Sequence, residues 1–337
     1  MLQAKCLCGL CLAALLLIVP AGVAGAADLA LASGTLNFTP AADEAQVPER
    51  FRLAAATFRW QAVPVPIDSQ SIEVWDVTFP SPVVTPQESN NTVHAEFYRS
   101  KRDGQRPAVI VLHILGGDFP LSRLFCNRLA QQGVSALFVK MPFYGPRREA
   151  GSSKRMVSAN PDETVEGMTQ AVLDIRRAVA WLADRPDVDA QRIGIFGISL
   201  GGITGGLAAS IEPRIGHICL LLAGGDIGRV ALDSPELRKV RGELPKSFGD
   251  KETLIKTLAV IDPVTYASRA KGKRILMLNA SRDEVIPKDC TLALWKAFGE
   301  PEISWYSGGH YSVIFHLPRA LERVAHFFAA EGVAGPR

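Results

Sequence analysis

Short apolar runs alternate with longer amphipathic segments along most of the chain. The run at residues 108–113 is continuously apolar, which predicts a strand buried on both faces of a parallel sheet. Strand and helix patterns alternate from there, as expected for parallel strands joined by helical crossovers. The later strands are predicted at 135–140, 192–198, 215–222, 274–279 and 303–306, and the helices at 122–132, 164–183, 200–210, 288–298 and 312–330.

Two earlier segments have a different strand character. Residues 72–79 and 92–98 alternate in polarity and are rich in β-branched and aromatic side chains, and a proline-rich stretch at 80–86 separates them. They predict an antiparallel edge of the same sheet. The pattern therefore predicts an α/β domain over residues 71–332, with a mostly parallel eight-stranded sheet and helices on both faces.

Two further segments do not fit the alternation. Residues 27–70 mix alanine, proline and charged residues without sustained periodicity, and we interpret them as an N-terminal extension lying on the domain. Residues 225–266 follow the sixth predicted strand, are rich in charge and carry helical patches at 234–241 and 251–259. Because an insertion at this point would follow a strand's carboxyl end, it predicts a small cap over that edge of the sheet.

The first 26 residues have the pattern of a secretory signal peptide. Lys5 precedes an apolar run at 7–19, and Ala24, Gly25 and Ala26 form a small-residue cleavage site. The run is shorter than the roughly 20 residues needed to span a bilayer. We therefore predict a secreted or periplasmic protein with no stable membrane anchor after cleavage; an uncleaved N-terminal anchor is the alternative.

Charge and cysteine content narrow the function classes. The formal net charge is +3 and 21% of residues are charged, with the basic side chains scattered, which disfavours nucleic acid as a partner. Removal of the signal peptide leaves Cys126, Cys219 and Cys290, an odd number spaced far apart, so no disulfide framework is predicted. Since no cysteine or histidine pair has ligand spacing, we also predict no metal site.

Residues 197–201 read Gly-Ile-Ser-Leu-Gly and carry the candidate nucleophile, Ser199. They lie between a predicted strand and a predicted helix, the setting that a nucleophile on a strained strand-to-helix turn requires. Gly197 and Gly201 leave room where the backbones approach closely. The backbone N–H of Leu200 would lie at the helix N-terminus, where it could stabilise an oxyanion.

A serine hydroxyl needs a general base and a carboxylate that orients the base. Asp283 follows the strand predicted at 274–279, and His310 follows the strand predicted at 303–306, so both lie in loops at strand ends. We predict Ser199, Asp283 and His310 as the catalytic residues. Glu284 and Asp226 are the alternative carboxylates, and the histidines better suited to structural or solvated roles are His94, His217, His316 and His326.

Two more loops contribute candidates at the same edge. Residues 113–117, His-Ile-Leu-Gly-Gly, end a predicted strand where a second oxyanion donor is expected; Leu115 N–H is our choice and Ile114 N–H the alternative. The loop 141–148 carries Tyr144 and Arg147, which we predict as substrate-pocket residues, with a solvated arginine as the alternative.

With these residues in the order Ser, Asp, His, residues 72–330 resemble the α/β-hydrolase superfamily, in particular its dienelactone-hydrolase-like and esterase branches. Dienelactone hydrolases are similar in fold but use cysteine as nucleophile, so the serine favours an ester hydrolase. Two positions depart from the family pattern: Ile114 stands where many members have glycine, and Met141-Pro142 replaces a frequent aspartate.

The resemblance implies a carboxylic ester hydrolase that acts on a small-molecule ester through an acyl-enzyme and needs neither metal nor organic cofactor. The first alternative is a serine peptidase of the same fold, which the short region before residue 72 disfavours. The second is a non-catalytic binding member of the superfamily, which the retention of all three catalytic residue types disfavours.

Overall fold

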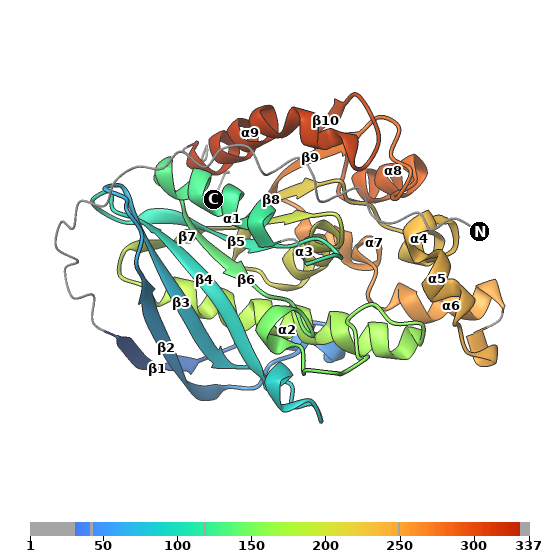
Figure 1. The fold of residues 1–337 in the computed structure, drawn as a ribbon, viewed down its shortest axis with the longest axis horizontal. Coiled ribbons are helices and arrows are strands. Elements are labelled where there is room, and N and C mark those ends of the chain that lie inside the picture. Colours follow the sequence, from blue (N-terminus) through green and yellow to red (C-terminus); the bar gives the residue numbers. More distant parts are fainter. Residues whose placement is uncertain (1–30, 41–42, 118, 249, 331–337) are drawn as a thin grey trace.

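A ten-stranded sheet forms the centre of the molecule (Figure 1). The computed structural model describes residues 31–40, 43–117, 119–248 and 250–330, so the predicted signal peptide at 1–26 lies outside the described residues. The order across the sheet is β1-β2-β3-β4-β6-β5-β7-β8-β9-β10. The strands are β1 (Ala32–Phe38), β2 (Ala56–Val65), β3 (Ile72–Pro80), β4 (Thr92–Ser100), β5 (Arg106–Leu112), β6 (Ser135–Val139), β7 (Val188–Ile198), β8 (Ile215–Leu221), β9 (Arg274–Ala280) and β10 (Glu302–Tyr306).

The sheet is divided into an antiparallel and a parallel part. Strands β1 to β4 pair antiparallel with their neighbours, and β4 pairs antiparallel with β6. All the remaining pairs, from β6 through β10, are parallel. Because parallel strands place their carboxyl ends at one edge, the loops after β5, β6, β7, β9 and β10 meet there.

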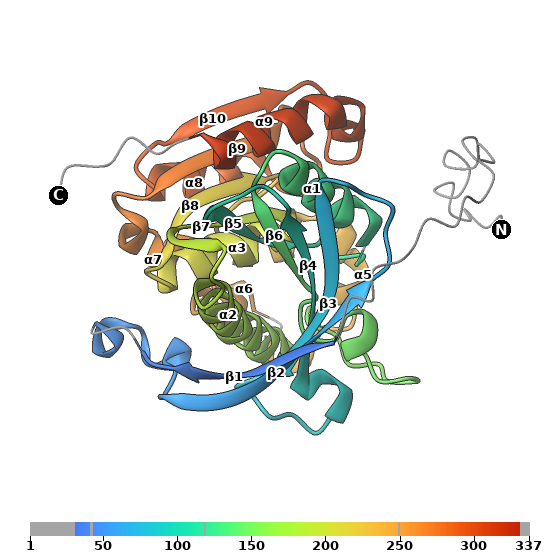
Figure 2. The same ribbon diagram turned by 90° about the vertical axis from the view of Figure 1, so that its left-hand side faces the viewer.

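The α/β class is confirmed, but the predicted number of eight strands is wrong. The two additional strands, β1 and β2, lie within the segment 27–70 that we interpreted as an extension without periodicity. Both alternate buried and exposed positions: Phe58, Trp60 and Ala62 of β2 point inward, and so do Leu36 and Phe38 of β1. They lengthen the antiparallel edge by two strands (Figure 2).

Helices cover both faces of the sheet. Helices α1 (Phe119–Gln131) and α9 (Leu317–Ala329) pack against each other on one face. The opposite face carries α2 (Pro161–Ala183), α3 (Leu200–Ile211) and α8 (Lys288–Ala297). All seven residues of β5 are buried between these layers, as its continuous apolar pattern predicts. None of the described helices is long and apolar enough to cross a membrane.

An ion-pair network and an aromatic contact join the N-terminal strands and their connection to α2. Arg176 of α2 pairs with Glu44 at 2.6 Å and with Glu212 at 3.0 Å, and its side chain is almost fully buried. The Trp60 ring of β2 meets the Trp181 ring of α2 edge-on, with centroids 5.7 Å apart. Strands β1 and β2 are thus packed into the same core as the parallel strands.

The segment 225–266, here called the insertion, folds into short helices between β8 and β9. They are α4 (Ile227–Asp233), α5 (Arg238–Gly242), α6 (Lys251–Ala259) and α7 (Pro263–Tyr266). Helix α6 has the predicted bounds 251–259, whereas the patch predicted at 234–241 divides into a 3₁₀ turn and α5. Helix α6 packs against α2, and α4 packs against α8.

Candidate active site

Ser199 occupies a strained turn directly between β7 and α3. Its backbone has φ 53° and ψ −114°, a conformation that non-glycine residues rarely adopt. The turn is held by the Ser199 N–H, which donates to the Leu221 carbonyl at 2.8 Å. A Cβ at Gly197 would lie 2.0 Å from the Gly201 carbonyl oxygen, and one at Gly201 would lie 2.6 Å from the His113 carbonyl oxygen. The two glycines are therefore required by close backbone approach.

The structure brings Ser199, His310 and Asp283 together. His310 Nε2 lies 3.1 Å from Ser199 Oγ, and both Asp283 carboxylate oxygens lie 2.9 Å from His310 Nδ1. Since a carboxylate can only accept, Nδ1 carries the proton and Nε2 is free to accept one from the serine hydroxyl. This is the arrangement in which a general base is oriented toward a nucleophile.

Asp283 is held in its own loop after β9. Its Oδ1 accepts hydrogen bonds from the backbone N–H groups of Val285 and Ile286, at 2.9 and 2.8 Å. The side chains of Asp283 and His310 are only 4% and 9% exposed. In this nearly dry surrounding, the interaction between the carboxylate and a protonated imidazole is screened less than it would be in water.

The two carboxylates considered as alternatives to Asp283 occupy different positions relative to His310. Glu284 Oε2 accepts a hydrogen bond from the backbone N–H of His310 at 2.9 Å, so it holds the main chain of the residue whose ring Asp283 holds. This contact was not predicted from the sequence. Asp226 begins α4 in a left-handed conformation, and among the described residues its side chain has no hydrogen bond to His310.

In the part of the chain that the structure describes, none of the other histidines forms a hydrogen bond with Ser199. His94 and His217 lie in strands, and burial lowers the pKa of each below its ordinary value. His316 bonds to Ser307, and His326 is exposed on α9.

His113 fixes the loop in which the second oxyanion donor is predicted. Its Nδ1 donates to the Ile114 carbonyl at 2.8 Å, and its Nε2 accepts from the Met141 N–H at 3.1 Å. The side chain is fully buried, and this burial lowers the pKa of His113 to about 4, so the ring is neutral. Sequence reasoning treated His113 only as the start of the loop, because its partners depend on the fold.

The predicted donors belong to two backbone segments that meet at this edge. Leu200 is the first residue of α3, where an N–H group has no partner within the helix. Leu115 lies in the turn closed by the hydrogen bond from Gly117 N–H to the Ile114 carbonyl, 3.0 Å long. The structure records no acceptor for the Leu115 N–H among the residues that it describes.

The two predicted pocket residues have different positions. Tyr144 packs against the His113 ring, with centroids 4.5 Å apart, and burial raises the pKa of its hydroxyl. Arg147 does not face a pocket: its side chain is fully buried, with Nη1 2.8 Å from Asp174 Oδ2 and Nη2 donating to the Asn90 carbonyl. Its charge is therefore used inside the fold, and we do not assign it to substrate.

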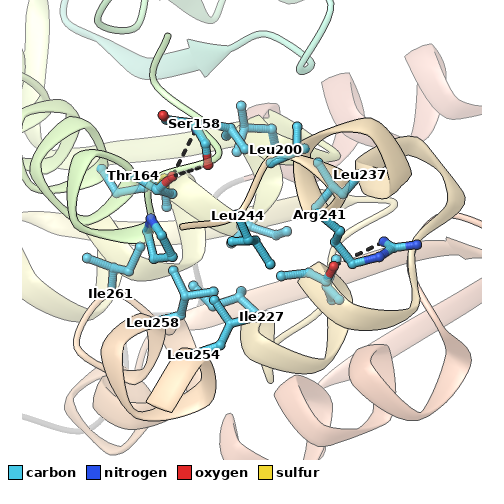
Figure 3. A pocket seen from close by; sticks show the side chains of 17 residues that line it. Ser158, Thr164, Leu200, Ile227, Leu237, Arg241, Leu244, Leu254, Leu258 and Ile261 are labelled. Carbon is cyan, nitrogen blue, oxygen red and sulfur yellow. Dashed lines mark hydrogen bonds between the residues drawn. The ribbon is translucent and has the colours of Figure 1, made fainter. Parts of the chain in front are cut away.

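An apolar cavity, here called the insertion cavity, begins beside the turn of Ser199. It has a volume of about 100 Å³ and is lined by residues from 157–168, by Leu200 and Ile203 of α3, and by residues from 227–261 (Figure 3). Tyr144 and Arg147, which the sequence predicts as pocket residues, are not part of this lining. Among the described residues, no group of three or more histidine, cysteine, aspartate or glutamate side chains is placed to hold a metal ion.

One family model and two curated proteins each match about half of the chain. A family model described as "Alpha/beta hydrolase domain containing 18" matches residues 66–228, which include Ser199 and end before Asp283. Two uncharacterized proteins of Mycobacterium tuberculosis strains are each 30% identical over 185 residues, covering 53% of this chain. The match spans only 42% of the length of these curated relatives.

Solved structures of similar fold include several esterases. An acetyl xylan esterase from Paenibacillus sp. R4 has a TM-score of 0.62 and 21% identity, covering 79% of this chain and 88% of that chain. Acetyl xylan esterase 1 from Thermoanaerobacterium sp. JW/SL YS485 has a TM-score of 0.61 and 20% identity, covering 78% and 87%. A putative dienelactone hydrolase from Klebsiella pneumoniae has a TM-score of 0.54 and 21% identity, covering 78% and 100%. The strand order, the helical layers and these likenesses give one fold, the α/β-hydrolase fold.

Proposed function

We propose that the protein is a serine hydrolase that cleaves carboxylic esters through an acyl-enzyme. The observation that carries the proposal is the hydrogen-bonded series Ser199–His310–Asp283, with distances of 3.1 and 2.9 Å, on a strained turn at the strand edge. The similar structures of two acetyl xylan esterases favour an ester over a peptide bond.

In the first half of the reaction, Ser199 Oγ attacks the ester carbonyl carbon while His310 Nε2 takes the hydroxyl proton. The carbonyl oxygen becomes an oxyanion that the N–H groups of Leu200 and Leu115 stabilise. When the tetrahedral intermediate collapses, the bond from carbon to the alcohol oxygen breaks and His310 returns the proton to the departing alkoxide. An acyl-serine and a free alcohol result.

Water completes the cycle. His310 takes a proton from water as its oxygen attacks the acyl carbon, and the bond to Ser199 Oγ breaks when the second tetrahedral intermediate collapses. The proton returns to the serine, and the carboxylic acid leaves. Asp283 stabilises the imidazolium that forms in each half and stays ionised throughout.

The test uses purified protein and the variant Ser199→Ala. We expect the wild type to hydrolyse short p-nitrophenyl esters and to be labelled at Ser199 by a fluorophosphonate, and the variant to lose both properties. Unchanged ester hydrolysis in Ser199→Ala would refute the assignment. Labelling together with cleavage of peptides but not esters would favour the serine peptidase, and absence of label on Ser199 would favour a non-catalytic binding protein.

A further inference from the structure

The insertion cavity is chemically uniform. Its lining is aliphatic apart from three residues, Ser158, Thr164 and Arg241. Leucine side chains reach it from four separate segments, which include α3 with Leu200, the loop after α5 with Leu244, and α6 with Leu258 (Figure 3). A space of this kind favours a ligand group that is apolar along its whole length.

The three polar lining residues already have partners within the protein. Thr164 Oγ1 accepts from the Ser158 N–H at 3.0 Å, and Ser158 Oγ donates to Glu163 at 2.6 Å. Arg241 Nη1 donates to the carbonyls of Ala231 and Ser234. These contacts hold the lining together, and because the rest of the lining is apolar, an occupant gains most of its binding energy from burial of apolar surface.

The position of the cavity decides which part of an ester it would receive. Leu200 contributes its side chain to the lining, and its backbone N–H is the expected oxyanion donor. No lining residue comes from the described loops that carry Asp283 and His310. The leaving alcohol must lie beside His310, which gives it a proton, so a chain that enters on the side of Leu200 belongs to the acyl group.

We propose that the insertion cavity holds the aliphatic acyl chain of the substrate, so that the enzyme prefers esters of medium-chain fatty acids over acetate esters. This inference rests on the proposed function. One enclosed water needs roughly 10–15 Å³ of such space, so about 100 Å³ accommodates a chain of roughly seven to ten carbons, if each carbon takes the space of one water. This preference would differ from the acetyl groups after which the two similar acetyl xylan esterases are named.

The first experiment measures kcat/KM for two series of esters with the wild-type protein. In p-nitrophenyl esters the acyl chain grows from acetate to dodecanoate, and we expect kcat/KM to rise about fourfold per methylene up to roughly seven to ten carbons and then to fall. In acetate esters the alcohol chain grows instead, and we expect little change. A maximum at acetate in the first series, or a rise in the second series alone, would overturn the proposal.

The second experiment reduces the volume of the cavity by enlarging one side chain of the insertion. Val240 lines it from α5 and is partly buried, while the neighbouring Lys239 on the same helix is exposed and does not line it. We expect Val240→Trp to lower kcat/KM for the octanoate ester at least tenfold while acetate hydrolysis is retained. Lys239→Trp is the matched control, with an unchanged chain-length profile. A Val240→Trp protein that keeps acetate hydrolysis and an unchanged profile would contradict the proposal.

A binding measurement separates this inference from the proposed function. Octanoate should raise the melting temperature of the wild type, acetate at the same concentration should not, and Val240→Trp should remove the octanoate effect. If no ester is hydrolysed and Ser199 is not labelled, the proposed function fails and the acyl assignment fails with it, even where octanoate binds. If esters are hydrolysed but octanoate gives no shift, only the cavity assignment fails.

Discussion

Glu284 Oε2 accepts a hydrogen bond from the backbone N–H of His310 at 2.9 Å. Its neighbour Asp283 holds the imidazole ring of the same residue. Two adjacent carboxylates thus fix one histidine, one through its main chain and one through its side chain. Gly309 allows this approach, because a Cβ at that position would lie 2.1 Å from Glu284 Oε2.

Glu284 is accordingly a positioning residue, and its removal should reduce turnover without removing the base. We expect Glu284→Ala to lower kcat by roughly 10–100-fold, because a small displacement of the base costs about that much, while KM changes little. Glu284→Gln keeps an oxygen that can accept from His310 N–H and should restore most of the activity. Steady-state kinetics of both variants test this, and equal losses in the two would argue against the backbone contact.

Asp283 should be essential for the orientation and charge of His310. Asp283→Asn retains an oxygen for the Val285 and Ile286 N–H groups, so the loop should keep its shape. The amide cannot stabilise a protonated imidazole, and we expect kcat to fall on the order of 10³–10⁴-fold. Asp289→Asn, on an exposed residue of α8, is the control. A loss of less than tenfold for Asp283→Asn would remove Asp283 from the catalytic residues.

The buried His113 predicts how stability depends on pH. Burial lowers the pKa of His113 from 6.5 to about 4 in the folded protein, so between these values the unfolded chain binds the proton more readily. The free energy of unfolding should therefore fall as pH decreases from 6.5 to 4, by roughly 3 kcal/mol from this residue. Denaturant unfolding at several pH values measures this dependence.

His94 and His217 also have lowered pKa values and contribute with the same sign, so the comparison uses a variant. His113→Phe cannot titrate, and the difference between its pH dependence and that of the wild type isolates the contribution of His113. Identical slopes in both proteins would show that His113 does not titrate in this range.

Much of the site could be predicted from the sequence because its residues follow strands in a fixed order. Ser199, Asp283 and His310 each come directly after an apolar strand pattern, and parallel strands bring their carboxyl ends to one edge. The contacts of Glu284 and His113 could not be predicted in the same way. The partner of Glu284 and one of the two partners of His113 are backbone N–H groups 26 and 28 positions away, and only the folded chain brings them together.

The strands β1 and β2 were missed for a different reason. The alternation of Phe58, Trp60 and Ala62 is present in the sequence. The alanines near the start of β2 and Pro64 near its end obscure this strand pattern. The stability of these strands comes from tertiary contacts, such as the edge-on packing of Trp60 on Trp181. The local sequence pattern predicts a strand poorly when the strand is stabilised mainly by contacts with residues that are distant in the sequence.

Substitution of Arg147 distinguishes a structural role from a role in substrate binding. The neighbouring Arg148 is exposed and provides the control. The Arg147 guanidinium pairs with Asp174, a fully buried carboxyl whose pKa is raised by burial. Arg147→Ala would leave that carboxyl unpaired, and we expect a loss of about 3–5 kcal/mol in the free energy of unfolding. Arg148→Ala should change it by no more than about 0.5 kcal/mol. An unchanged stability in Arg147→Ala, combined with a raised KM, would instead support a role in substrate binding.

Gly197 and Gly216 are both strand glycines with opposite surroundings. A Cβ at Gly197 would meet the Gly201 carbonyl oxygen at 2.0 Å, whereas nothing lies within 4 Å of a Cβ at Gly216 in β8. In Gly197→Ala the backbone must shift at the turn of Ser199, so we expect a loss of roughly 1–3 kcal/mol in stability and at least a 100-fold loss of kcat. Gly216→Ala should keep both within error, as thermal unfolding and ester hydrolysis would measure. Full activity in Gly197→Ala would mean that the turn tolerates movement, and the strain at Ser199 would then not be needed to aim its hydroxyl at His310.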